Sequence, residues 1–218
     1  MREEKKLKMS DKGLLVVISG FSGVGKGTLM KELISKYNNY ALSVSATTRA
    51  PREGEENGRE YYFKSKEEFE EMIKNDRLLE YASYVGNYYG TPKMYVEDMM
   101  EKGKDVILEI EVQGAKKIKE KVPDAVTVFV VPPSAEELKN RLIGRGTETK
   151  EVIDARLARA YEESFAMEDY DYILVNDNLS ESVQSMHSLI QSVHCNTIYN
   201  KKFMNNLRED MKRFSEGE

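Results

Sequence analysis

The stretch Gly-Phe-Ser-Gly-Val-Gly-Lys-Gly-Thr, residues 20–28, directly follows the apolar run at residues 14–18. Such a run is typical of a buried strand, and apolar side chains at positions 29, 30, 33 and 34 mark one face of a following helix. The glycines let backbone amides point inward at a phosphate, the helix N-terminus attracts an anion, and Lys26 adds a cation. Strand, turn and helix together predict a P-loop.

A P-loop indicates a nucleoside triphosphate, and a strand-to-helix turn without a ligand is the alternative. The stricter pattern has Ser or Thr directly after the lysine, where this chain has Gly27, so the direct magnesium ligand is left open. Thr28 has three open roles: binding a phosphate oxygen, binding magnesium, or capping the helix. We expect the following residues to bind ATP: Gly20, Phe21, Ser22, Gly23, Val24, Gly25, Lys26, Gly27 and Thr28.

Composition narrows the class of protein. The chain has 218 residues, 33 Lys and Arg against 38 Asp and Glu, a net charge of −5, one Cys and two His. This length predicts one domain, and so few Cys and His exclude a disulfide framework and a structural zinc site. The acidic balance argues against a nucleic-acid or membrane-surface binder, and every apolar run is far shorter than a membrane helix requires. We expect a soluble cytoplasmic protein, with a homo-oligomer left open.

Further buried strands are predicted at residues 41–44, 105–110, 125–131 and 172–175, with helical patterns between them. Continuous apolar strands that alternate with helices predict an α/β fold with a mostly parallel sheet covered on both faces. Two stretches interrupt this alternation: a Tyr-, Gly- and Arg-rich segment at about residues 46–93, and a basic helix–loop–helix around residues 141–159.

Several helix boundaries can be predicted from local patterns. Capping-box spacing occurs at Ser65, Ser134 and Asn178, each followed three residues later by Glu. Thr91 before Pro92 fits a cap followed by proline at the first helical position. At the C-terminus, apolar residues 203, 207, 211 and 214 have helical spacing, and we expect a last helix docked on the body rather than one that binds a partner.

The first interrupting segment contains a candidate phosphate site. Arg49 and Arg52 flank Pro51, and two arginines on a rigid turn form a fork suited to a phosphate monoester. Two solvated surface arginines are the alternative. The tyrosines that follow, among them Tyr61 and Tyr89, either pack this small region or complete the phosphate site with their hydroxyls.

Six motifs in this order and spacing resemble the guanylate kinase family: GFSGVGKGT, SVSATTRAPREGEENGREYYF, LEYASYVGNYYGTP, ILEIEVQG, VPPSAEELKNRLIGRGTET and VNDN. The resemblance extends from residue 14 to about residue 193. It implies a P-loop nucleoside-monophosphate kinase that transfers the γ-phosphoryl group of ATP, carried with Mg²⁺, to GMP or dGMP. The implied fold is a parallel five-stranded core sheet flanked by helices, with a small GMP-binding α/β region and a helical lid.

The resemblance also implies a division of the chain. Residues 1–12 are expected to be a disordered lead, residues 13–195 the kinase domain, and residues 196–218 a C-terminal helical extension. Within the domain we expect the GMP-binding region at residues 46–93 and the lid at residues 137–167. The core takes the remaining segments: 13–45, 94–136 and 168–195.

Site roles are carried over by matching positions to the family's motifs. Lys26, Arg49, Arg145 and Arg156 are the implied catalytic residues, with Arg141 a weaker third lid arginine, and Asn176 in VND is implied on the adenine side of ATP. Glu80 would accept hydrogen bonds from guanine, and Glu111 stands where many members have Asp, as does Glu109. The implied GMP-binding residues are Ser45, Arg49, Arg52, Tyr61, Glu80, Tyr89, Thr91, Glu109 and Glu111.

Two other functions stay open. A kinase for AMP or a pyrimidine nucleotide would share the P-loop and the lid but would have no use for Glu80. A guanylate-kinase-like binding module would keep the fold without catalysis, typically with a degraded P-loop and without lid arginines. Lys26, Arg145 and Arg156 are all present in this chain.

Overall fold

The computed structural model describes residues 12–84, 86–144, 146 and 149–215. Almost all of the expected lead, residues 1–12, lies outside this part of the chain, as does Arg145, one of the expected catalytic arginines.

The core is a five-stranded sheet with the strand order β2-β7-β1-β8-β9, and every neighbouring pair is parallel. The sheet and its class agree with the expectation from the sequence, and each predicted strand is found to within two residues at either end. The strands are β1 Leu15–Gly20, β2 Tyr40–Leu42, β7 Asp105–Glu109, β8 Val126–Val131 and β9 Tyr172–Val175.

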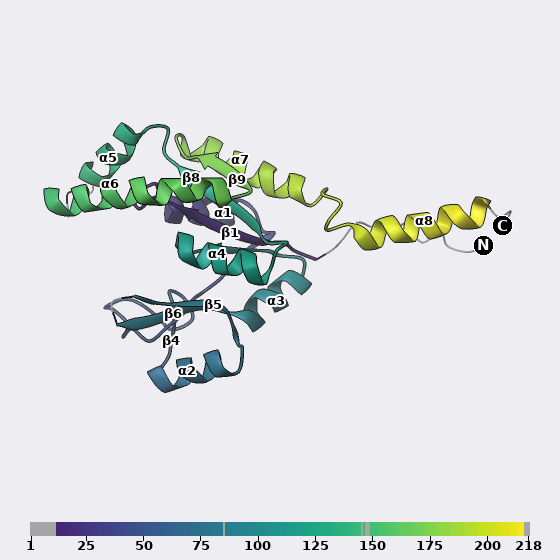
Figure 1. The fold of residues 1–218 in the computed structure, drawn as a ribbon, viewed down its shortest axis with the longest axis horizontal. Coiled ribbons are helices and arrows are strands. Elements are labelled where there is room, and N and C mark those ends of the chain that lie inside the picture. Colours follow the sequence, from purple (N-terminus) through teal and green to yellow (C-terminus); the bar gives the residue numbers. More distant parts are fainter. Residues whose placement is uncertain (1–11, 85, 145, 147–148, 216–218) are drawn as a thin grey trace.

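Helices cover both faces of this sheet (Figure 1). Leu29, Leu33 and Met186 lie in a core that joins one face to α1 and α7, whereas Val96 and Ile118 attach α3 and α4 to the other. Both faces of the strands are therefore apolar, which explains the uninterrupted hydrophobic runs in the sequence. The four helices are α1 Lys26–Lys36, α3 Lys93–Glu101, α4 Val112–Lys121 and α7 Leu179–Val193.

A second, smaller sheet forms a lobe beside the core together with one helix (Figure 1). Its strand order is β4-β3-β6-β5, with antiparallel pairing of β6 to both β3 and β5. Phe69, Leu78 and Ala46 give this lobe a small core of its own. The elements are β3 Ala46–Thr47, β4 Tyr62–Phe63, α2 Lys66–Lys74, β5 Leu78–Tyr84 and β6 Asn87–Pro92.

Two helices follow β8 and fill the segment expected to form the lid. They are α5 Ala135–Gly144 and α6 Lys150–Ser164, and the 3-10 turn η1 Phe165–Asp169 connects α6 to β9. Within the described ranges, no helix is both long and apolar enough to cross a membrane.

The helix starts predicted at Ser65, Ser134 and Asn178 are confirmed, because each side-chain oxygen accepts the amide three residues on. The start predicted from Thr91 and Pro92 is wrong in its detail. Helix α3 begins at Lys93 with Pro92 as its N-cap, and the Thr91 hydroxyl donates instead to Glu80 Oε1 at 2.8 Å. The Thr91 hydroxyl, which the local pattern assigns to a helix cap, thus donates to Glu80 on the neighbouring strand instead.

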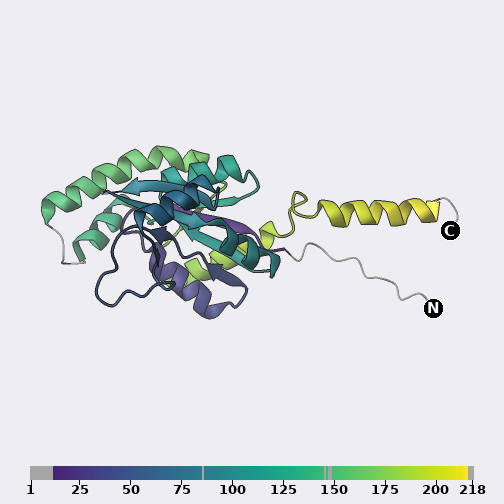
Figure 2. The same ribbon diagram turned by 90° about the horizontal axis from the view of Figure 1, so that it is seen from below.

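The last helix, α8 Lys201–Ser215, was expected to dock on the body, and this expectation is wrong. None of its residues is buried, and Met211 and Phe214 are 61% and 78% exposed. Figures 1 and 2 show α8 extending away from both sheets. Helical spacing of apolar residues predicts the helix and its amphipathic face correctly, but it does not say what that face contacts.

Candidate active site

The P-loop connects the end of β1 to the start of α1 in a conformation that only glycine adopts easily. Gly23 and Gly25 have φ angles of 91° and 97°, and Gly25 is the N-cap of α1, so Thr28 is not the cap. Lys26 folds back over the loop, and its Nζ donates to the carbonyl of Gly20 at 2.6 Å and to that of Phe21 at 3.3 Å. The loop therefore presents an anion-binding helix end with a cation beside it.

Three side chains from distant segments support the loop from outside. The buried Asn176 amide donates to the Val24 carbonyl at 2.8 Å, and Arg141 donates to the Asn176 carbonyl at 2.9 Å. Arg156 of α6 reaches the Ser22 hydroxyl at 3.1 Å. Arg156 thus lies at the P-loop, as expected of a lid arginine. Asn176 and Arg141 both donate to one carbonyl of the loop, that of Val24, the arginine at 3.2 Å.

Three of the residues expected to bind the monophosphate come together in the small lobe: Arg49, Tyr61 and Tyr89. Arg49 lies with its guanidinium carbon 5.4 Å from the Tyr61 ring centre, and the Tyr61 and Tyr89 rings meet edge to face at 5.9 Å. Burial raises the pKa of the Tyr61 hydroxyl, which stays a neutral hydrogen-bond donor. A guanidinium and two phenols form a compact set of donors suited to a phosphate.

Glu80 is a buried carboxylate on the same side of the lobe. It is 7% exposed and accepts the Thr91 hydroxyl, and its Oε2 faces α4, where a Cβ built on Gly114 would lie 3.5 Å away. Burial raises the pKa of Glu80. Because Tyr89 and Thr91 are two residues apart on β6, they point to the same face of the small sheet. The phosphate donors and the buried acceptor therefore share one surface.

Two further carboxylates lie at the carboxyl end of the core sheet, where ligands bind in such folds. Glu109 is the last residue of β7, and a Cβ built on Gly27 would lie 4.0 Å from its Oε2. Desolvation raises the pKa of the Glu109 carboxyl, while the charge of Lys26 counteracts this shift. Glu111 is exposed and accepts a hydrogen bond from Arg159 of α6 at 3.1 Å.

Two other expected GMP-binding residues, Ser45 and Arg52, lie in the chain segments on either side of β3. Ser45 is half-buried and precedes β3, where its carbonyl accepts the Tyr62 amide at 2.8 Å. Arg52 is exposed in the loop after β3. Among the described residues, no group of three or more His, Cys, Asp or Glu could hold a metal ion.

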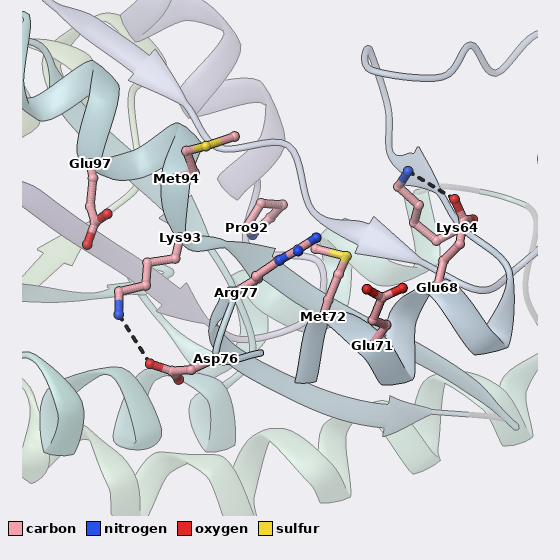
Figure 3. A pocket seen from close by; sticks show the side chains of 10 residues that line it. All are labelled: Lys64, Glu68, Glu71, Met72, Asp76, Arg77, Pro92, Lys93, Met94 and Glu97. Atoms are coloured by element: carbon pink, nitrogen blue, oxygen red, sulfur yellow. Dashed lines mark hydrogen bonds and ion pairs between the residues drawn. The ribbon is translucent and has the colours of Figure 1, made fainter. Parts of the chain in front are cut away.

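A separate pocket of about 640 Å³ lies between α2 and α3 on another part of the lobe (Figure 3). None of its lining residues belongs to the predicted site. Its charges are largely paired, as Lys93 contacts Asp76 at 3.2 Å and Lys64 contacts Glu68 at 3.5 Å. With more acidic than basic side chains in its lining, the pocket gives no net attraction for a phosphate group.

Sequence reasoning gave no site role to two residues that shape the site. Glu55 binds Arg49, and Arg159 links α6 to Glu111. Glu55 lies six residues after Arg49 in a loop with several other charged residues, and no local sequence pattern indicates which of them it pairs with. The i,i+4 spacing of Arg159 and Glu163 was visible, but it indicates only a surface pair on one helix.

Comparison with known proteins agrees with this geometry. A family model described as guanylate kinase matches residues 12–193. The chain is 54% identical over 186 residues to a guanylate kinase of Lactococcus lactis, covering 85% of this chain and 91% of that protein. It is also 54% identical over 187 residues to a guanylate kinase of Bacillus cereus, with 85% and 91% covered.

A solved structure extends the comparison to the fold. The crystal structure of guanylate kinase from Anaplasma phagocytophilum matches with a TM-score of 0.68 and 34% identity, covering 87% of this chain and 90% of that chain. Helix α8 lies outside the residues that the family model matches. Because the family model matches most of the chain and the relatives from Lactococcus lactis and Bacillus cereus are 54% identical over most of both chains, the chain belongs to the guanylate kinase family.

Proposed function

We propose that this chain transfers the γ-phosphoryl group of ATP to GMP or dGMP and releases ADP and the nucleoside diphosphate. The observation that carries this proposal is the buried carboxylate of Glu80, which lies on the same face of the small sheet as the arginine–tyrosine cluster. The arginine–tyrosine cluster at one end of that face suits a phosphate. The Glu80 carboxylate at the other end suits the edge of a base that carries hydrogen-bond donors. The P-loop supplies the site for the second nucleotide.

Guanine fits this arrangement because it presents a ring N–H and an exocyclic amine on one edge. An ionised Glu80 accepts from both, and the Thr91 hydroxyl keeps the carboxylate oriented. Adenine has an unprotonated ring nitrogen there, which would leave a buried carboxylate against a lone pair. An unpaired buried polar group costs about 1–3 kcal/mol, and more when it is charged.

The nucleophile is a phosphate oxygen of GMP, which is ionised at neutral pH, so the reaction requires no general base. The barrier is electrostatic, since two polyanions must approach each other. Lys26 at the triphosphate, Arg49 at the monophosphate and Arg156 from the lid provide the neutralising charge, and Arg145 is proposed to join them. Lid and lobe closure excludes water, which would otherwise hydrolyse ATP.

Magnesium is proposed to arrive with ATP. Mg²⁺ prefers oxygen ligands and is usually held by one or two carboxylates together with substrate phosphates and water. Glu109 beside the P-loop and the hydroxyl of Thr28 fit that preference. When bound, the ion supplies positive charge to the phosphates. We further propose that the chain acts in the cytoplasm, in purine nucleotide metabolism and GMP recycling.

The deciding experiment measures ADP production from ATP in a coupled assay with GMP, dGMP, AMP, CMP and UMP as acceptors. We expect rapid turnover with GMP and dGMP only. Comparable turnover with AMP or a pyrimidine nucleotide would identify another nucleotide kinase. Binding of GMP without ADP production would identify a binding module.

A further inference from the structure

The carboxylate of Glu55 holds the guanidinium of Arg49. Arg49 Nη2 donates to both carboxylate oxygens of Glu55, each at 2.9 Å. The two side chains are only 16% and 17% exposed, so this ion pair is shielded from water although it lies in a loop. A shielded, two-contact pair restricts a long side chain much more than an exposed pair does.

The same carboxylate also fixes the backbone of the loop. Glu55 Oε2 accepts the Arg52 amide at 2.7 Å, and the Glu55 amide donates to the Arg52 carbonyl at 3.1 Å. The Arg52 amide and the Arg49 guanidinium hold the pKa of the Glu55 carboxyl below its usual value, so the group is ionised at neutral pH. Both arginines of the proposed phosphate fork therefore depend on one side chain.

Aromatic rings and a carbonyl complete the setting of Arg49. Its guanidinium carbon lies 5.4 Å from the Tyr61 ring centre and 5.8 Å from that of Phe63, and Nη1 donates to the Ala50 carbonyl at 2.8 Å. A guanidinium carries five N–H donors in a fixed plane, so these contacts orient it and still leave donors for a ligand.

We propose that Glu55 is a positioning residue for the monophosphate site, acting through Arg49 and the Arg52 backbone without touching the substrate. The inference rests on the proposed function, in which Arg49 binds the GMP phosphate. Pre-orientation lowers the entropy lost when GMP binds. Removing the carboxylate therefore weakens GMP binding and leaves the ATP side unchanged.

The test is steady-state kinetics on the full chain, with KM measured separately for GMP and ATP. We expect Glu55→Gln to raise the KM for GMP about tenfold, with a smaller change in kcat and an unchanged KM for ATP. Glu55→Asp keeps the charge with a shorter reach, so its KM for GMP is expected to rise less. The control is Glu53→Gln, which removes the same charge from an exposed position in the same loop.

A double-mutant cycle with Arg49→Ala tests whether Glu55 acts through that arginine. In the Arg49→Ala background, we expect Glu55→Gln to change the KM for GMP much less than it does alone. Fully additive effects would overturn the inference. So would a folded Glu55→Gln with an unchanged KM for GMP, or with a lower one, which would mean that Glu55 competes with the phosphate.

Two measurements separate a folding defect from a loss of GMP binding. Circular dichroism establishes whether each variant is folded. If Glu55→Gln does not fold, an unchanged KM for GMP in Glu55→Asp overturns the inference. Arg49→Ala alone tests the proposed function: an unchanged KM for GMP there removes Arg49 from the phosphate site. A large effect of Arg49→Ala without an effect of Glu55→Gln contradicts only the role of Glu55.

Discussion

The P-loop and the arginine–tyrosine cluster of the small lobe are both built to bind phosphate, but from different materials. Backbone carbonyls of Gly20 and Phe21 hold Lys26, in a loop whose shape depends on glycine dihedral angles. By contrast, Arg49 is held by side chains, namely the carboxylate of Glu55 and the rings of Tyr61 and Phe63.

This difference matters for how each site can be changed. A loop whose shape is set by its backbone loses its function when its lysine is replaced, or when a glycine with a positive φ angle is replaced. A cluster defined by side chains also depends on partners such as Glu55, which is proposed not to touch the ligand. The lobe also contains the buried Glu80, which we propose selects the base. We therefore expect substitutions in the P-loop to affect turnover, and those in the lobe to affect GMP binding and base choice.

The largest expected effect concerns base choice in the lobe. Sites built to hydrogen-bond a donor discriminate by roughly 10⁴-fold or more, so we expect kcat/KM for GMP to exceed that for AMP by about this factor. Glu80→Ala should remove most of this preference, whereas Glu97→Gln, an exposed carboxylate on α3, should not. Competition kinetics with both nucleotides measure the ratio. Comparable specificity constants in the unaltered protein would contradict the guanine assignment.

On the P-loop side, Lys26→Ala should lower kcat by roughly 10²-fold or more, since this cation stabilises charge that develops on the transferring phosphate. Lys31→Ala on the exposed surface of the same helix is the matched control. Single-turnover measurements at saturating ATP and GMP isolate the chemical step. If the folded Lys26→Ala variant kept normal turnover, the P-loop would have no part in the mechanism.

The lid gives an intermediate effect that separates turnover from binding. Arg156 reaches Ser22 of the P-loop and lies outside the small lobe. Arg156→Ala should lower kcat about tenfold, the value of one charged hydrogen bond, with the affinity for GMP nearly unchanged. Lys150→Ala, an exposed cation on the same helix, is the control, and isothermal titration measures GMP binding. If Arg156→Ala lost GMP binding but kept its normal rate of phosphoryl transfer, the assignment of Arg156 to the ATP side would be wrong.

The smallest expected effect is on stability, and it concerns the lobe alone. Burial raises the pKa of Glu80, so the folded protein binds a proton at this carboxyl more readily than the unfolded chain does. Glu80 therefore destabilises the fold increasingly as the pH rises from its unfolded-state pKa to its folded-state pKa. Glu80→Gln should therefore raise the melting temperature at neutral pH in the absence of nucleotide.

The gain in melting temperature should shrink as the pH falls from the folded-state pKa of Glu80 toward the lower pKa of the unfolded chain, and it should vanish below the latter, where Glu80 is neutral in both states. Thermal unfolding followed by circular dichroism at several pH values measures this difference. A gain that stays constant with pH would mean that burial of the charge is not its cause.

Much of the fold could be predicted from the sequence because its determinants are local. The strand at residues 172–175 agrees with β9 residue for residue, since four apolar residues between polar turns define its ends. The P-loop could be predicted because nine consecutive residues contain the glycines, the lysine and the helix start. Local sequence already suggested Arg49 as half of a phosphate-binding fork, whereas the role of Glu80 came only from resemblance to a family. The structure brings both side chains onto one lobe.

Other features depend on contacts that no short stretch of sequence contains. Glu80 draws the Thr91 hydroxyl away from the expected helix cap, and Asn176 reaches the P-loop from 152 residues along the chain. Helix α8 has the amphipathic pattern of a docked helix but extends away from the body. By itself the sequence determined where strands, helices and the phosphate loop form, because backbone preference and hydrophobic periodicity act over a few residues. Only the tertiary structure decided which side chains hold Arg49, Thr91 and the P-loop in place, because those partners meet only after the chain has folded.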